Sequence, residues 1–254
     1  YGAAGKKVKR ILAIDKRLER GAMEFQNRCS FFKKLLTSSE LYDRITNDII
    51  QYYEKSIIQR KGEFIMTFVE KYGKILLPLI TPYKENEEVD YDQYAKLIEY
   101  LIENDLCDSL IVTGTTGEAY LLTFDERVKL LETAIKASAG RKPVIAGTGC
   151  ASTKETIALT KKAEELGIEL CLIVCPFYNK PTQEGLYLHY KAIAESTKVD
   201  IMLYNIPIFV GVNLEAETVA RLAAIPNIVA VKDEAGVNPT QVTDFILAAR
   251  AVDP

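Results

Sequence analysis

The chain has 254 residues, a hydrophobic fraction of 48% and a formal net charge of −3, so it can bury the core of one large α/β domain or two small ones. Charges of both signs are interspersed, which argues against a nucleic-acid-binding protein and favours a small-molecule partner.

The five cysteines form no CxxC pair, and His189 is the only histidine. The spacing of zinc ligands is therefore missing, and we expect no metal or other cofactor, with reduced, mostly buried thiols and no disulfide. No stretch approaches the roughly 20 apolar residues of a membrane span, and the N-terminus lacks an apolar run of signal-peptide length. We expect a cytoplasmic protein without membrane contact.

Residues 1–65 have a helical texture and form a predicted extension of unknown role. The segment 37–40 has the T-x-x-E form of a capping box, and Ile45, Ile49 and Tyr53 then recur at helical spacing. One amphipathic helix over about 38–60 is predicted, either packed on a neighbouring element or available to a partner. Nothing in this segment carries chemistry.

From residue 66 onward, short runs rich in Ile, Val and Leu alternate with helical patterns, as in βα units around a parallel sheet. The predicted strands are 75–81, 109–113, 143–147, 170–175, 201–204 and 228–232. Capping boxes at 123–126 and 152–155 open helices that run toward residues 139 and 166.

This alternation predicts an α/β fold of the (β/α)8 barrel type over 66–254, incomplete in this chain because only about six units are visible. A doubly wound sheet stays open as the alternative.

Two strand ends carry side chains suited to carbonyl chemistry. Lys232 ends an apolar strand, where burial favours the neutral amine that can attack a carbonyl and form an imine. Tyr204 ends the preceding strand, and a phenol beside an imine can relay protons. The competing interpretations are a lysine paired with Asp233 or Glu234, and a core tyrosine with a satisfied hydroxyl.

A glycine-rich turn follows the second strand. Gly114 and Gly117 permit a tight turn whose backbone N–H groups, together with the hydroxyls of Thr115 and Thr116, can hold a carboxylate. The turn lacks the lysine and the spacing of a phosphate loop.

Taken in order, GTTGE at 114–118, PFYNKP at 176–181, YNIP at 204–207 and KD at 232–233 resemble the dihydrodipicolinate synthase and N-acetylneuraminate lyase family of Schiff-base aldolases. The resemblance covers the chain from Met66 to its end and lies nearer to the synthase branch.

The resemblance implies that Lys232 forms the Schiff base with pyruvate. Tyr204 and Thr115 would form the proton relay, and Thr116 would bind the pyruvate carboxylate. Tyr178 matches a tyrosine that synthase-type members insert across a dimer interface, so a homo-oligomer is expected. The implied reaction joins pyruvate to aspartate semialdehyde, as in 4-hydroxy-tetrahydrodipicolinate synthases of lysine biosynthesis.

Phe209 departs from the pattern, because the synthase branch carries at this position an arginine that binds the carboxylate of aspartate semialdehyde. Loss of a charge-assisted carboxylate contact costs on the order of 2 kcal/mol. A less charged or longer aldehyde would fit better, so a 2-keto-3-deoxy sugar acid aldolase is the alternative within the family. A catalytically inactive scaffold is the alternative of another class, since family members supply two further βα units.

Overall fold

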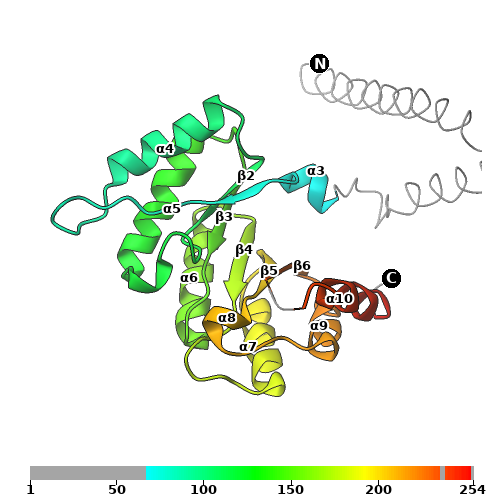
Figure 1. Ribbon diagram of the computed structural model, residues 1–254. Coiled ribbons are helices and arrows are strands. Elements are labelled where there is room, and N and C mark those ends of the chain that lie inside the picture. Colours follow the sequence, from blue (N-terminus) through cyan, green and yellow to red (C-terminus); the bar gives the residue numbers. More distant parts are fainter. Residues whose placement is uncertain (1–66, 235–237, 253–254) are drawn as a thin grey trace, which may run out of the picture. The chain divides into compact units, whose positions relative to one another are not determined.

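A computed structural model describes residues 67–234 and 238–252 (Figure 1). The predicted extension over 1–65, with its helix at 38–60 and Cys29, lies outside the described residues, so these predictions stand as made.

Six parallel strands form one sheet, in the order in which they occur in the chain. They are β1 Leu76–Pro78, β2 Ser109–Val112, β3 Val144–Gly147, β4 Leu170–Val174, β5 Asp200–Asn205 and β6 Ile228–Asp233. All six predicted strands are confirmed. A doubly wound sheet would reverse its strand order at a switch point, whereas the six described strands run in sequence as half of a barrel.

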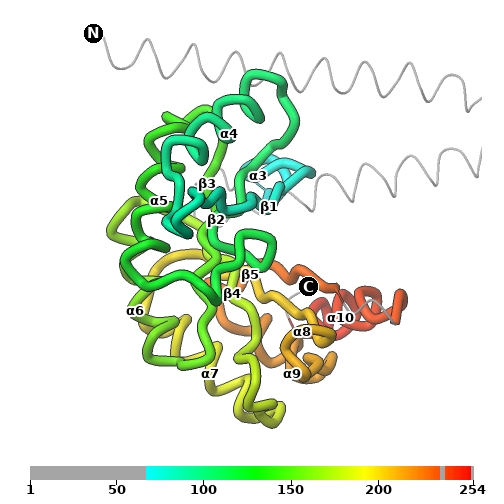
Figure 2. The backbone as a smooth tube through the Cα atoms, turned by 60° about the vertical axis from the view of Figure 1, so that its left-hand side comes forward, coloured from blue at the N-terminus to red at the C-terminus, as the bar shows by residue number. Residues whose placement is uncertain are grey.

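The helices alternate with the strands and pack beside one another along the sheet (Figure 2). In chain order they are α3 Phe68–Tyr72, α4 Tyr91–Glu103, the short η1 Ala119–Leu121, α5 Phe124–Ser138, α6 Thr153–Glu165, α7 Gln183–Ser196, α8 Pro207–Val210, α9 Ala216–Ala223 and α10 Gln241–Arg250.

The predicted helix starts have the expected caps. Thr123 and Glu126 form both bonds of a capping box at α5, and the Ser152 hydroxyl accepts a hydrogen bond from the Glu155 amide at α6. These bonds satisfy N–H groups that have no partner inside the helix. They fix the points where the chain turns from each strand end into its helix.

The central strands are buried on both faces, which explains why they read as unbroken apolar runs. Leu110, Ile145, Leu170 and Ile173 are fully buried. The outermost described strands, β1 and β6, each have one described neighbour, and β1 is shorter than the predicted 75–81. In β6 only Ile228 is buried, so the strand that carries Lys232 is less covered than its neighbours.

Candidate active site

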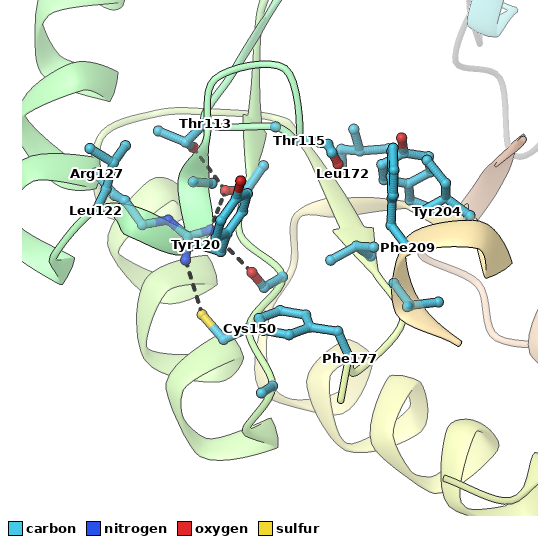
Figure 3. A pocket seen from close by; sticks show the side chains of 18 of the residues that line it. Thr113, Thr115, Tyr120, Leu122, Arg127, Cys150, Leu172, Phe177, Tyr204 and Phe209 are labelled. Carbon is cyan, nitrogen blue, oxygen red and sulfur yellow. Dashed lines mark hydrogen bonds between the residues drawn. The ribbon is translucent and has the colours of Figure 1, made fainter. Parts of the chain in front are cut away.

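A cavity of about 830 Å³ opens at the carboxyl ends of the strands (Figure 3). Its lining comes from the last residues of β3, β4 and β5 and from the loops and helix starts that follow β2 to β5, including Thr113, Gly114, Thr115, Tyr120, Arg127, Gly147, Cys150, Glu155, Leu172, Phe177, Tyr204, Ile206 and Phe209. Ligands of parallel α/β folds bind at this edge, because the variable loops converge there.

The glycine-rich turn after β2 is held by its own backbone and by Thr81, which follows β1. The Gly117 amide donates to the Gly114 carbonyl at 3.1 Å, and the Thr81 hydroxyl donates to the Gly117 carbonyl at 2.7 Å. A Cβ on Gly117 would lie 2.9 Å from the Leu79 carbonyl oxygen, so a larger residue would push the turn away.

This turn leaves donors for a ligand. Within 67–234 and 238–252, the amide N–H groups of Thr115 and Thr116 have no hydrogen-bond partner. Thr115 lines the cavity, whereas Thr116 is exposed and does not. Successive free N–H groups in a turn are the kind of backbone feature that can bind an anion.

The strand ends β2 and β3 approach each other closely because position 147 is glycine. A Cβ there would overlap the Thr113 carbonyl group. The Thr113 hydroxyl instead donates to the Gly147 carbonyl at 2.8 Å. Thr113 adopts a left-handed conformation with φ of 56°, and this bend directs the following turn into the cavity.

Lys232 and Tyr204 are paired across β5 and β6. They are register partners, and the Lys232 Nζ lies 4.0 Å from the centroid of the Tyr204 ring. The lysine also forms a close ion pair with Glu234, and its side chain is 26% exposed. The alternative interpretation, in which Lys232 pairs with a neighbouring carboxylate, is therefore correct for Glu234. The nitrogen must leave Glu234 before it attacks a carbonyl.

The structure gathers some of the predicted site residues and separates others. Gly114, Thr115, Tyr204 and Phe209 line the cavity, and Lys232 lies against the tyrosine ring.

Four predicted residues fall outside the cavity lining: Lys232, Thr116, Gly117 and Tyr178. The Tyr178 side chain is 92% exposed, and its φ is 75°. Within the described residues, nothing covers this side chain.

Arg127 was not predicted as a site residue. It is 6% exposed, and its guanidinium donates to the Gly147 carbonyl at 2.8 Å and to the Cys150 sulfur at 3.1 Å. Among the described residues it forms no ion pair with a carboxylate, and its Nε has no hydrogen-bond partner. The sequence pattern that could have identified it is a charged residue on the apolar face of a helix, where Leu130, Leu131 and Ala134 follow at helical spacing.

The cysteines behave as predicted within the described residues, where Cys107, Cys150, Cys171 and Cys175 are free. Burial raises the pKa of Cys171 to about 12 and that of Cys175 to about 11. These two thiols stay protonated and act as core residues.

The described residues contain no group of three or more His, Cys, Asp or Glu side chains that could hold a metal ion. They also contain no helix with the length and apolar character needed to cross a membrane.

Comparison with known proteins gives one consistent family. The profile of the dihydrodipicolinate synthetase family matches residues 71–249. A 4-hydroxy-tetrahydrodipicolinate synthase of Halalkalibacterium halodurans is 48% identical over 174 residues, which cover 68% of this chain and 58% of the relative. The enzyme of the same name from Bacillus subtilis is 48% identical over 166 residues, covering 65% of this chain and 57% of the relative.

Solved structures agree in fold. The dihydrodipicolinate synthase of Acinetobacter baumannii, solved with pyruvate, matches with a TM-score of 0.67 and 43% identity over 70% of this chain and 61% of that one. The dihydrodipicolinate synthase of Thermotoga maritima matches with a TM-score of 0.66 and 41% identity, covering 72% of this chain and 61% of that one. The chain thus spans less than two thirds of the length of these relatives, but the matched part carries the six strands and the cavity, and the chain belongs to the dihydrodipicolinate synthetase family.

Proposed function

We propose that the domain is a pyruvate-dependent lyase of the 4-hydroxy-tetrahydrodipicolinate synthase type, with Lys232 as the Schiff-base amine. The observation that carries the proposal is the Lys232–Tyr204 pair, in which the Lys232 Nζ lies 4.0 Å from the centroid of the Tyr204 ring and Tyr204 lines the cavity. The names of the relatives and the pyruvate bound to the Acinetobacter baumannii enzyme support it.

In the proposed first step, the Lys232 amine attacks the ketone carbon of pyruvate and the carbinolamine loses water to give a protonated imine. The Tyr204 hydroxyl lines the cavity and delivers the proton that the departing hydroxide needs. Thr115, which also lines the cavity, completes the proposed relay. The free N–H groups of Thr115 and Thr116 receive the pyruvate carboxylate.

In the second step, the protonated imine withdraws electrons from the methyl carbon, which loses a proton and becomes a nucleophilic enamine. The enamine carbon attacks the aldehyde of the second substrate, and water then releases the product from Lys232. Aspartate semialdehyde is the proposed aldehyde. Phe209 lines the cavity where the resemblance expects an arginine, so this chain should bind the semialdehyde carboxylate weakly.

We further propose that the protein acts as a homo-oligomer. Tyr178 supports this, because a large aromatic side chain that is 92% exposed on a left-handed backbone has no covering within the described residues. A second copy that covers it would bring the phenol to the partner's site.

The test is a partial reaction that needs no second substrate. An enzyme that forms the enamine exchanges the methyl protons of pyruvate with deuterium from solvent, and proton NMR follows the exchange. We expect wild-type protein to catalyse this exchange and Lys232→Ala to lose it. Equal exchange in the two proteins, or none in either, would contradict the proposal.

A further inference from the structure

A cluster of side-chain amides lies directly behind the Lys232–Tyr204 pair. Asn205, Asn213 and Gln241, which we call the amide cluster, come from the end of β5, the loop after α8 and the first residue of α10. Asn205 is 0% exposed and Gln241 is 7% exposed. Each residue of the cluster bonds to the other two or to a common acceptor, so three separate segments meet here.

The cluster converges on the carboxylate of Asp233. The Asn205 Nδ2 donates to Asp233 Oδ1 at 2.8 Å, and the Gln241 Nε2 donates to the same oxygen at 3.0 Å. Among the described residues no lysine, arginine or histidine forms an ion pair with Asp233. Neutral amides therefore hold this negative charge in place of a cation.

The amides also bind one another. Asn213 Nδ2 donates to Gln241 Oε1 at 2.8 Å, while Gln241 Nε2 donates back to Asn213 Oδ1 at 3.1 Å. The Asn205 Nδ2 donates to Asn213 Oδ1 at 2.9 Å, and the Asn205 Oδ1 accepts from the Leu214 amide at 3.0 Å. With donors and acceptors paired in this way, the cluster specifies one arrangement.

The position of the cluster connects it to the candidate active site. Asn205 and Asp233 are the residues that immediately follow Tyr204 and Lys232, and they are likewise register partners. Since successive side chains of a strand point to opposite faces, Lys232 faces Tyr204 while Asp233 faces the amide cluster. The Glu234 amide also donates to the Asn205 carbonyl at 2.8 Å. Fixing Asp233 therefore fixes the backbone from which Lys232 projects.

A buried set of polar groups around a carboxylate adds little stability over apolar residues of the same volume, but it selects one geometry. We propose that Asp233 and the amide cluster are positioning residues, which hold the Lys232 amine against Tyr204 for imine formation. This inference rests on the proposed function, because Lys232 must be the reacting amine.

The experiment reverses the polarity of one bond. Gln241→Glu replaces a donor to Asp233 with a second carboxylate, so the two oxygens repel and the end of β6 shifts. In the double variant Asp233→Asn with Gln241→Glu, the amide introduced at position 233 can donate to the carboxylate introduced at position 241. Thr243→Glu is the matched control, since it adds the same charge to the first turn of α10 at an exposed position.

The readout is the rate of pyruvate methyl exchange, normalised to the folded fraction measured by circular dichroism. We expect Gln241→Glu to lower the rate at least about tenfold, the double variant to recover most of that loss, and Thr243→Glu to match wild type. A purely structural role would change the folded fraction and leave the normalised rate and its recovery unaffected.

The outcomes separate the two proposals. If wild type exchanges and Gln241→Glu exchanges equally fast per folded molecule, or the double variant is no faster than Gln241→Glu, the positioning inference is overturned and the proposed function stands. If wild type gives no exchange, the proposed function fails, and the positioning role fails with it.

Discussion

Acidification should destabilise this domain through one buried histidine. His189, in α7, is 5% exposed, and its Nδ1 is hydrogen-bonded to the Thr153 hydroxyl at 2.8 Å. Its Nε2 is buried without a partner. A proton added there would place an unpaired charge between α6 and α7, so burial lowers the pKa of His189 from 6.5 to about 4.

The size and sign of the change in stability with pH follow from the linkage between proton binding and folding. Between about pH 6.5 and 4 the unfolded chain binds a proton at this position and the folded chain does not, so stability falls as pH falls through this window. The two pKa values differ by about 2.5, and at about 1.4 kcal/mol per unit the full effect is roughly 3 kcal/mol. Above about pH 6.5 the histidine contributes no pH dependence.

The assay compares wild type with His189→Asn, which keeps an amide near the Nδ1 position for Thr153 and does not titrate. Urea unfolding at a series of pH values gives the free energy of unfolding of each protein. The variant should be less stable at neutral pH because the substitution leaves a cavity. The difference between the free energies of unfolding of wild type and variant should then shrink by roughly 3 kcal/mol toward pH 4. The pH dependence contributed by carboxylates is the same in both proteins, so it cancels when their free energies of unfolding are subtracted. A gap that does not change with pH would refute the reasoning.

Four further results are expected. Gly147→Ala should lower the free energy of unfolding by about 3 kcal/mol or more in urea titrations, because its Cβ would overlap the Thr113 carbonyl; a loss below about 1 kcal/mol would mean that the two strand ends can separate. Phe209→Arg should raise turnover of aspartate semialdehyde roughly 30-fold in a coupled assay while leaving pyruvate exchange unchanged, and no gain would mean that another residue supplies the cation. Tyr204→Phe should slow pyruvate exchange by roughly 100-fold at an unchanged melting temperature, whereas a wild-type rate would remove the tyrosine from the relay. Deletion of 1–65 should leave pyruvate exchange intact, and its loss in a truncated chain that stays folded would show that this segment contributes to the site.

The sequence was sufficient for the strands and for the starts of α5 and α6. Parallel strands buried on both faces must be continuous apolar runs, and the caps at Thr123 and Ser152 satisfy N–H groups that every helix start exposes. The shorter β1 was not foreseen. It has a single described neighbour, and pairing depends on partners that the local sequence does not encode.

The proximity of Lys232 and Tyr204 was predictable, because both end neighbouring strands and the register places them side by side. The ion pair with Glu234 was one of two alternatives, because a carboxylate two residues away can reach the amine or turn to solvent. Arg127 was missed because the guanidinium of a helix residue reaches carbonyls at and just after the end of β3, which lie 20 and 22 positions away in the chain. The amide cluster joins segments up to 36 positions apart, from Asn205 to Gln241.

Covalent trapping of pyruvate tests the central claim most directly. Sodium borohydride reduces a lysine–pyruvate imine to a stable secondary amine, which peptide mass spectrometry assigns to one residue. We predict that wild-type protein treated with pyruvate and borohydride carries the adduct on Lys232, and that Lys232→Ala carries none. An unmodified wild-type chain, or the same adduct on another lysine in both proteins, would contradict it.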